Sequence, residues 1–290
     1  MSYAVFRCCP TNTLLKQYED STDAVLRMLG IPFVDIQEFG CCGYPLKNIN
    51  FEAFVLSSAR NLALAENSKA DILTFCSCCF GNLKHAQKRM QENPSLKDRI
   101  NDLLRKEGLE YKEDARVMHL FEALFDVVGL DAIDAKLGKT LSSELKIAVH
   151  YGCHLLRPSR MVHFDSLLKP SLLDQLVEIT GASSIEWSAK LDCCGSPVLG
   201  IDDALSMDLA EKKVISALQA GADFLCVACP YCQLQFERIQ KKLKATRKIE
   251  NGIPSILFTQ LVGLCLEIDG EKLGVDQHNS DILGIYKFLT

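Results

Sequence analysis

The residues with the clearest chemical potential are two Cys-Cys-Gly triplets. Cys41-Cys42-Gly43 comes shortly before Pro45, and Cys193-Cys194-Gly195 comes shortly before Pro197. Adjacent cysteines bridge to each other poorly because the small ring strains the disulfide torsion, whereas two neighbouring thiolates can bind neighbouring ions of a polynuclear metal centre. The glycine lets the backbone turn tightly around a bulky group. Each triplet is therefore predicted to be a metal-binding loop.

The same set of cysteines occurs twice: a single cysteine, the adjacent pair and a Cys-x-x-Cys pair. The first set is Cys9, Cys41, Cys42, Cys76 and Cys79, and the second is Cys153, Cys193, Cys194, Cys229 and Cys232. Five thiols are one more than a zinc ion or a conventional four-iron cubane needs. Sites made only of thiolates select zinc, copper(I) or iron–sulfur. An adjacent pair within five thiols favours a multi-iron cluster in each half.

Zinc and disulfides are the alternatives for these cysteines. Zinc suits Cys76-x-x-Cys79 and Cys229-x-x-Cys232 taken alone, but the two pairs lie far beyond zinc-ribbon separations. A disulfide scaffold fits the even count of 14 cysteines, yet such scaffolds are short and poor in core residues. The sequence leaves open whether Cys8 or Cys9 is the ligand, and likewise whether Cys76 or Cys78 is.

Predicted strands lead into these cysteines. In the first half, residues 3–6, 31–36 and 72–75 are expected to be strands, with helices at 13–30 and 51–67 between them. In the second half, residues 146–153, 184–187 and 222–225 are expected strands, the first ending in a cysteine, with helices at 172–180 and 205–220. Strands alternating with helices predict a parallel α/β sheet, whose sites lie at the carboxyl ends of the strands.

The predicted fold is therefore α/β, an internal duplication of two Rossmann-like parallel-sheet halves related by a pseudo-twofold axis. The polar run from 131 to 143 has no strand character and is expected to separate the halves. We predict domains at residues 1–140 and 144–290, each with one iron–sulfur site. Helical, charged residues 82–108, broken at Asn93-Pro94, and a helix at 121–128 complete the first half.

Bulk properties exclude several classes of function. A net charge of −5 and a pI near 5.7 leave no basic face for nucleic acid. No run of about 18 apolar residues is present to span a bilayer, and the N-terminal residues lack the pattern of a signal peptide. The expected protein is cytoplasmic, without a membrane span. No glycine-rich phosphate loop is found, so no flavin or nicotinamide site is expected in this chain.

The two cysteine sets and their flanking residues resemble a known family. The matching stretches are residues 58–65 (SARNLALA), 151–158 (YGCHLLRP), 228–233 (ACPYCQ) and 258–263 (FTQLVG). The pattern is similar to the cysteine-rich CCG domains of the heterodisulfide reductase B subunit. Paired CCG motifs also occur in glycolate, lactate and glycerol-3-phosphate oxidoreductase subunits and in a succinate dehydrogenase subunit, but the flanking matches favour the heterodisulfide reductase family.

The resemblance implies a function as well as a fold. In that family each five-cysteine set holds a noncubane [4Fe–4S] cluster, and the substrate disulfide lies between the two clusters. This chain would then be the catalytic subunit of a CoB–CoM heterodisulfide reductase-like complex, reducing a small disulfide to two thiols. Its electrons would come from a ferredoxin-type iron–sulfur protein like the C subunit of that complex and from a flavoprotein like its A subunit.

A physical argument agrees with this expectation. Cleaving a disulfide takes two electrons, whereas an iron–sulfur cluster ordinarily passes one, so a doubled site suits a bond between two sulfurs. His150 and His154 flank Cys153 and are candidates to carry protons. Arg157 and Lys47 are candidates to bind an anionic substrate group. Structural histidines and solvated surface charge are the alternative roles for these four residues.

Two other functions compete with disulfide reduction. The chain can be an electron-relay subunit of a different dehydrogenase or of a sulfur-oxidising complex, in which its clusters only pass electrons or the reaction runs in reverse. It can also be a zinc-stabilised interaction module. Bound iron and labile sulfide separate the last from the others, and release of thiols from a disulfide separates the first two.

Overall fold

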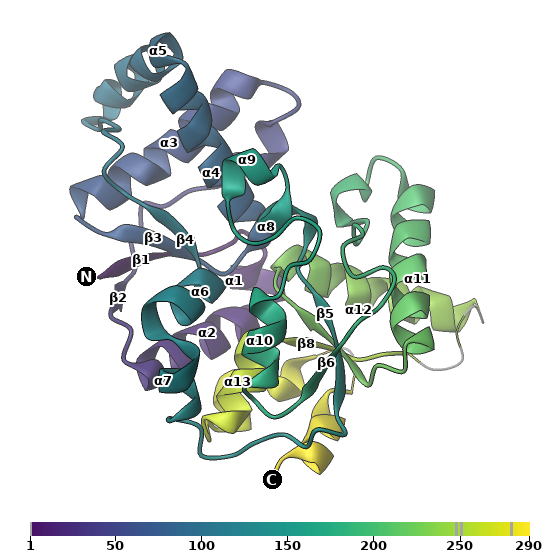
Figure 1. The fold of residues 1–290 in the computed structure, drawn as a ribbon. Helices are drawn as coiled ribbons and strands as arrows, with labels where there is room; N and C mark the ends of the chain where they lie inside the picture. Colours follow the sequence, from purple (N-terminus) through teal and green to yellow (C-terminus); the bar gives the residue numbers. More distant parts are fainter. Residues whose placement is uncertain (1, 247–248, 250–251, 279–280) are drawn as a thin grey trace.

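Two four-stranded, all-parallel sheets organise the chain (Figure 1). The structure, a computed structural model, describes residues 2–246, 249, 252–278 and 281–290. The strand orders are β2-β1-β3-β4 in the first half and β6-β5-β7-β8 in the second. The prediction of a duplicated α/β fold with parallel sheets is confirmed.

The first half contains four strands and the helices that connect them. Its elements are β1 (Tyr3–Phe6), α1 (Thr11–Leu14), α2 (Lys16–Leu29), β2 (Phe33–Val34), η1 (Tyr44–Leu46), α3 (Phe51–Asn67), β3 (Asp71–Thr74), α4 (Ser77–Glu92), α5 (Pro94–Leu104), η2 (Arg105–Glu107), β4 (Val117–His119), α6 (Leu120–Glu122), η3 (Ala123–Val128) and α7 (Leu130–Asp134). Here η1 and η2 are 3₁₀ helices, and η3 is a π-helix.

The second half repeats this strand order with a shorter connection between its last two strands. Its elements are β5 (Lys146–His150), α8 (Cys153–Leu156), α9 (Ser159–Val162), α10 (Leu172–Glu178), β6 (Ser183–Ile185), η4 (Ser196–Val198), α11 (Asp203–Gln219), β7 (Phe224–Val227), α12 (Pro230–Ala245), β8 (Ser255–Leu257), α13 (Phe258–Cys265), α14 (Gly270–Leu273), η5 (Val275–Gln277) and η6 (Leu283–Phe288). The η helices of this half are 3₁₀ helices.

Strand register shows which residues of the two halves are equivalent. Phe6 pairs with Thr74 at the end of β1, and His150 pairs with Val227 at the end of β5. Because two residues separate Phe6 from Cys9 and His150 from Cys153, these two cysteines occupy the same position in their halves.

Helix starts are equivalent too. The side chain of Asn50 caps α3 by accepting from Ala53 N, and that of Asp202 caps α11 by accepting from Leu205 N. Such a cap satisfies a backbone N–H that the helix leaves without a partner. The two longest helices therefore begin at the same distance from their Cys-Cys-Gly triplets.

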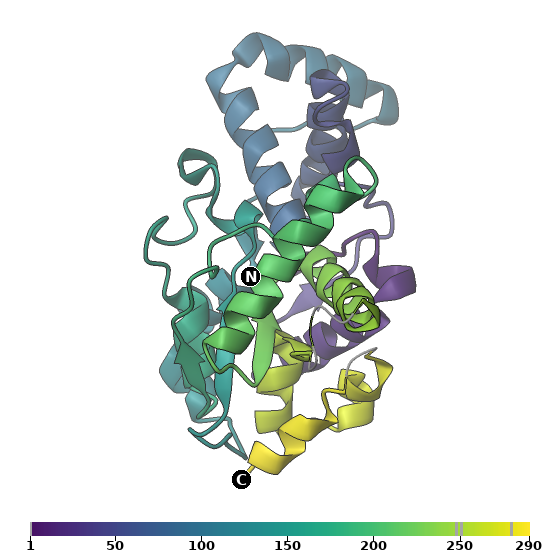
Figure 2. The ribbon, with the colours of Figure 1, turned by 90° about the vertical axis from the view of Figure 1, so that its right-hand side faces the viewer.

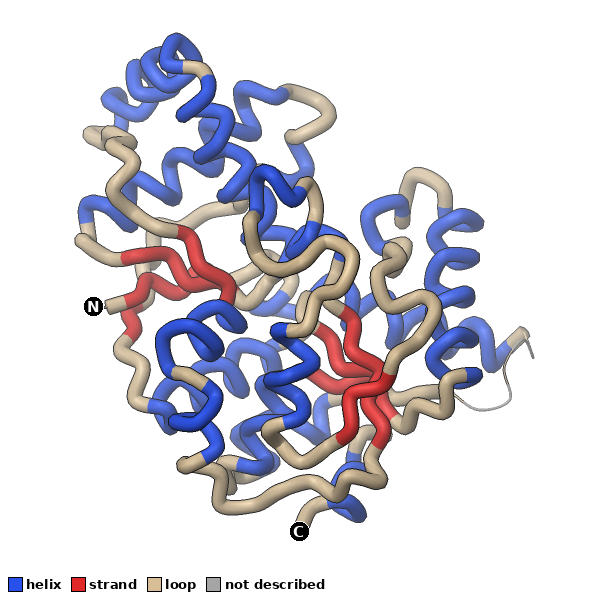
Figure 3. Tube along the Cα trace, viewed as in Figure 1, coloured by secondary structure: helices blue, strands red, loops and turns tan. Residues whose placement is uncertain are grey.

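Helices from both halves pack in a layer between the sheets. Helix α2 of the first half packs against α13 and α14 of the second, and α10 of the second half contacts α6 of the first. Figure 3 shows the two sheets separated by these helices. Within the layer Ser21 and Thr259 share a buried hydrogen bond of 2.7 Å, and the rings of Phe121 and Phe258 lie 5.2 Å apart. Each half thus covers apolar surface of the other.

Several elements differ from the sequence expectation. The helix expected at 13–30 is broken after Leu14, where Leu15 leaves helical geometry. The strand expected at 31–36 is only Phe33–Val34, because it lies at a sheet edge and pairs on one side alone. The helix at 121–128 becomes a π-helix from Ala123. The polar run 131–143 lacks a strand, as expected, but begins within α7; the division at 140 and 144 remains a prediction.

Among the described residues, we find no helix with both the length and the apolar character needed to cross a membrane.

The contact between halves predicts how a core substitution changes stability. Phe121 and Phe258 are both fully buried, so Phe121→Ala removes a ring at the point where the two halves meet. Such a change costs about 3 to 5 kcal/mol, and the melting temperature should fall on the order of 10 °C for a chain of this size. Calorimetry under anaerobic conditions measures the change.

The matched control is Val127→Ala, since Val127 lies nearby in the chain but is 59% exposed. It should leave the melting temperature within about 2 °C, because surface truncations change stability little. Equal effects of the two variants would contradict the packing argument.

Candidate metal centre

The predicted ligands lie at the carboxyl ends of the parallel strands. Cys9 follows β1, Cys76 begins the turn after β3, and Cys153 and Cys229 occupy the same places after β5 and β7. Figure 2, with Figure 1, places the loops before α3 and α11 at one end of the molecule, away from the C-terminus. The sheets therefore deliver both cysteine sets to one region, as open α/β sheets do for their sites.

All ten predicted thiols form one continuous series of neighbouring sulfurs. In order along the series they are Cys9, Cys41, Cys42, Cys79, Cys76, Cys229, Cys232, Cys194, Cys193 and Cys153, each close enough to the next to shift its pKa. The halves meet where Cys76 Sγ lies 3.9 Å from Cys229 Sγ. The structure thus brings the two sets together, and their roles as ligands remain a prediction.

Cys8 also belongs to the first group of thiols. Its sulfur lies within 4.8 Å of those of Cys76 and Cys79, and all three side chains are buried. Cys9, by contrast, is exposed and contacts Cys41. Strand register makes Cys9 the counterpart of Cys153, whereas Cys8 corresponds to Gly152. Both cysteines therefore remain candidate ligands, Cys8 by proximity and Cys9 by symmetry.

At the next pair, Cys76 and Cys78 have separate surroundings. Cys76 lies in the series of sulfurs, but Cys78 lines a cavity, and its Sγ lies 3.4 Å from the Asn82 amide nitrogen. Its counterpart in the second half is Tyr231, which lines the same cavity. Symmetry therefore favours Cys76 over Cys78 as the ligand.

The glycines of the two triplets turn the backbone toward the sulfurs. Gly43 and Gly195 have φ angles of +82° and +83°, and each N–H points to the sulfur two residues earlier, at 3.4 Å. A Cβ on Gly43 would lie 2.8 Å from Phe54 O, and one on Gly195 would meet Ser206 O. A left-handed φ and this close approach both require glycine.

Mutual contact and burial shift the pKa values of the thiols in opposite directions. Hydrogen bonds from Cys42 and Cys9 lower the pKa of Cys41 to about 2, and those from Cys153 and Cys194 do the same for Cys193. Contact with these thiolates raises the pKa of Cys42 and of Cys194 to about 12. Only some of these sulfurs can be charged together unless a cation lies among them.

The donor set fits an iron–sulfur centre. It consists of sulfur atoms, mostly buried, with one imidazole, a composition that soft metal centres prefer. The penalty for charging several buried thiols at close range disappears when each binds a positive metal ion. The residues present therefore fit iron–sulfur binding.

The two predicted histidines lie in different surroundings. His150 is fully buried, and its Nε2 lies 3.2 Å from Cys232 Sγ, within a group that also includes Cys194. Burial holds the pKa of His150 well below its ordinary value. His154 is half-buried at the cavity, with Nδ1 3.7 Å from Cys153 Sγ. Burial lowers the pKa of His154 as well.

The two predicted cationic residues lie outside the described cavity lining. Arg157 is exposed, and Lys47 donates a hydrogen bond to Asn82 Oδ1 at 3.2 Å and lies over the Phe54 ring. Neither side chain lines the cavity in the described part of the chain, so their role in binding an anionic substrate stays a prediction.

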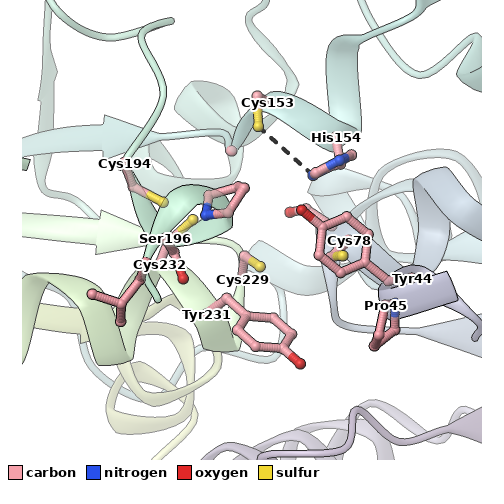
Figure 4. A pocket seen from close by; sticks show the side chains of 14 residues that line it. Tyr44, Pro45, Cys78, Cys153, His154, Cys194, Ser196, Cys229, Tyr231 and Cys232 are labelled. Carbon is pink, nitrogen blue, oxygen red and sulfur yellow. Dashed lines mark hydrogen bonds between the residues drawn. The ribbon is translucent and has the colours of Figure 1, made fainter. Parts of the chain in front are cut away.

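A cavity of about 250 Å³ lies between the two halves, beside the second thiol set (Figure 4). Both halves line it, with Tyr44, Pro45, Ser77 and Cys78 from the first and Gly152, Cys153, His154, Cys194, Ser196, Pro197, Leu199, Cys229, Tyr231 and Cys232 from the second. Sequence reasoning missed Tyr44, Ser196 and Tyr231. Their signal was position, since two directly follow the Cys-Cys-Gly triplets and one lies inside a Cys-x-x-Cys pair.

A close helix contact holds the cavity walls in place. Helix α4 packs against α8 and α9 of the other half, and a Cβ at Gly81 would lie 2.7 Å from His154 O. The glycine thus lets α4, which carries Cys78, approach the backbone that carries Cys153 and His154.

Comparison with known proteins agrees with this geometry. The model of the CCG cysteine-rich domain matches residues 3–84 and 147–237. The B subunit of the ferredoxin/F420H2-dependent CoB–CoM heterodisulfide reductase of Methanosarcina acetivorans is 33% identical over 279 residues, covering 95% of this chain and 92% of the relative. The chain belongs to the heterodisulfide reductase B-subunit family.

Other members of the B-subunit family and its relatives differ in their named roles. A protein of Archaeoglobus profundus, named as like the heterodisulfide reductase B subunit, is 28% identical, covering 94% of this chain and 93% of the relative. The 8-methylmenaquinol:fumarate reductase membrane anchor subunit of Wolinella succinogenes is 31% identical, covering 96% of each chain.

Among solved structures, a hypothetical protein from Helicobacter pylori has the same fold. Its TM-score is 0.77 at 20% identity, and the match covers 97% of this chain and 52% of that chain. This chain thus spans about half of the Helicobacter protein, and the likeness concerns the fold alone.

The glycine turns give a prediction about metal content. In Gly43→Ala the new Cβ meets the Phe54 carbonyl at a left-handed φ, so the loop must move and displace Cys41 and Cys42. With one four-iron site predicted in each half, the iron bound per chain, measured after anaerobic purification, should fall to about half of the wild-type value.

Gly40→Ala is the control in the same loop, since no atom lies within 4 Å of its Cβ position. It should retain full iron content. Loss of all iron from Gly43→Ala, or of none, would contradict two separate sites.

Proposed function

We propose that this chain is the disulfide-cleaving subunit of a heterodisulfide reductase-type complex. Cys9, Cys41, Cys42, Cys76 and Cys79 would hold one noncubane [4Fe–4S] cluster, and Cys153, Cys193, Cys194, Cys229 and Cys232 the other. The observation that carries the proposal is the cavity that both halves line, with Cys78 from the first half and Cys153, Cys194, Cys229 and Cys232 of the second thiol set in its walls.

The reaction consumes two electrons and two protons and yields two thiols from one disulfide. When bound, each cluster passes one electron. The cavity provides room for a small disulfide, with Cys78 and Tyr44 from one half facing Cys153, Cys194 and Cys232 from the other. Its walls would hold the S–S bond next to the second thiol set.

The cavity is symmetric in its backbone but not in its side chains. Equivalent positions carry Tyr44 and Ser196 after the triplets, and Cys78 and Tyr231 inside the Cys-x-x-Cys pairs. A disulfide with two different ends fits such a cavity in one preferred orientation. This asymmetry supports an unsymmetrical disulfide as the substrate.

His154 is the better candidate of the two histidines for supplying a proton. It lines the cavity beside Cys153 and packs edge-on against Tyr44, with ring centroids 5.5 Å apart. His150 is fully buried against Cys232 and is absent from the described lining. His154 can therefore deliver a proton to a product sulfur, while His150 orients the second thiol set.

The electrons would arrive from partner subunits. The relatives from Methanosarcina and Archaeoglobus are named as subunits or subunit-like proteins of heterodisulfide reductases. By analogy, a ferredoxin-type iron–sulfur protein like the C subunit would donate to this chain, and a flavoprotein like the A subunit would feed that donor.

The second candidate function is electron relay without disulfide cleavage. It is favoured by the Wolinella relative, which is as similar in identity and coverage but is named as a membrane anchor subunit of a quinol:fumarate reductase. In that case the cavity would bind no disulfide, and the two thiol sets would only pass electrons onward.

One experiment tests the proposed function. Protein purified anaerobically should contain about eight irons and a similar amount of labile sulfide per chain, and with a reduced dye it should release thiols from an unsymmetrical disulfide. Cys193→Ala should abolish turnover, because it removes a ligand from the second set. Cys265→Ala, in the apolar helix α13, should retain it.

The outcomes separate the alternatives. Zinc without labile sulfide would support an interaction module, and iron–sulfur without thiol release from any disulfide would support electron relay. Full turnover in Cys193→Ala would remove the basis of the two-site proposal.

The role of His154 predicts a defect in turnover. His154→Gln keeps a polar side chain of similar reach but cannot supply the proton, so kcat for disulfide reduction should fall about 10² to 10⁴-fold. Steady-state kinetics with a reduced dye measures it, and the iron content should not change.

His163→Asn is the control, since His163 is exposed and adopts a left-handed φ of 47° that Asn accommodates. It should leave kcat within a factor of about two. A normal kcat in His154→Gln would exclude this histidine as the proton donor.

A further inference from the structure

A buried lysine distinguishes the second thiol set from the first. Lys213, in α11, has 0% of its surface exposed, which is unusual for a lysine. Its Nζ donates hydrogen bonds to the carbonyl oxygens of Ala189 and Lys190 and lies 4.3 Å from the centroid of the Trp187 ring. These residues form the segment that leads into Cys193-Cys194-Gly195.

The equivalent position in the first half is neutral. Gly43 and Asn61 are separated by as many residues as Gly195 and Lys213, and the equivalent caps and glycine contacts place α3 and α11 in the same register. Asn61 accepts a hydrogen bond from Gly40 N at 2.8 Å and donates to Cys41 O at 3.0 Å. An amide thus binds the loop that carries the Cys-Cys-Gly triplet in the first half, and an ammonium binds the equivalent loop in the second.

No carboxylate in the described part of the chain forms an ion pair with Lys213. The nearby Asp174 and Asp192 pair instead with Lys190 and Lys212. A buried ammonium is costly unless an anion compensates it. The groups whose charge favours its protonated form are Cys194, Cys232, Asp192 and Cys193, so three of the four belong to the second thiol set. Burial nevertheless lowers the pKa of Lys213 to about 8, which leaves it mainly protonated at pH 7.

We propose that Lys213 raises the reduction potential of the second iron–sulfur site above that of the first, so that an incoming electron resides there first. The proposal rests on the proposed function, because it requires a redox centre at each thiol set. A positive charge stabilises the reduced, more negative form of a nearby centre. Lys213 acts through the thiolates and does not line the cavity, which makes it a positioning residue rather than a catalytic one.

The first set also has a lysine in its vicinity, and the comparison with Lys213 favours the second site. Lys47 interacts with Cys78 and Cys42, but its side chain is only partly buried. Solvent and salt screen a partly exposed charge far more than a buried one. The field of Lys213 should therefore dominate the difference between the two sites.

An anaerobic redox titration of the iron-loaded protein, followed by electron paramagnetic resonance, tests the proposal. The wild type should show two one-electron transitions at separate potentials. In Lys213→Met the midpoint potential of the higher transition should fall by at least 59 mV. For a one-electron couple, this lowers the reduced-to-oxidised ratio at a fixed potential at least tenfold. For the lower transition, the reduced-to-oxidised ratio at a fixed potential should change by less than a factor of three.

Two further variants control for charge and for position. Lys213→Arg keeps the positive charge and should restore the higher transition. Lys47→Met removes the partly exposed charge and should move the lower transition by less than Lys213→Met moves the higher one. Lys213→Gln, which still donates to the two carbonyl groups, repeats the test if the methionine variant binds less iron than the wild type.

Several results would overturn the proposal. These are coincident transitions in the wild type, transitions unmoved in the folded neutral variants, or equal shifts of both transitions. A wild-type protein with zinc and no labile sulfide would instead refute the proposed function, and this inference with it. Iron-loaded protein that cleaves disulfides but shows coincident transitions would refute this inference alone.

Discussion

The structure depends on one electrostatic constraint, the crowding of buried thiols. Sulfurs from both halves lie in one continuous series, in which Cys76 Sγ of the first half lies 3.9 Å from Cys229 Sγ of the second. Buried thiolates at such range repel one another and lose their hydration, so the set is stable in charged form only around metal cations. The glycine turns at Gly43 and Gly195 and the placement of every set at strand ends serve to hold these sulfurs together.

Within a shared backbone, the two halves have diverged in the side chains that surround the sulfurs. The position of Tyr44 in the first half is taken by Ser196 in the second, that of Cys78 by Tyr231 and that of Asn61 by Lys213. The duplicated elements supply two similar metal environments, and the unmatched side chains make the cavity and its electrostatics directional. Chemistry that treats two sulfurs of one bond differently needs both properties.

The sequence predicted the parts of the structure that depend on local pattern. Strand β1 and helix α3 were located to the residue because an apolar run and a helical apolar face each end at clear boundaries. The ten thiols were expected together because the spacing repeats. By contrast, the proximity of Cys8 to Cys76, the different surroundings of His150 and His154, and the burial of Lys213 depend on packing between distant segments. No periodicity in the chain encodes those contacts.

The packing of α2 against α13 and α14 joins the two halves of the chain. A single half, taken alone, would expose the surface of α2 that packs against α13 and α14. Two copies related by a twofold axis would cover one another reciprocally, as in an isologous homodimer. The layer between the sheets thus has the arrangement of an isologous dimer interface, held within a single chain whose two centres differ in their side chains.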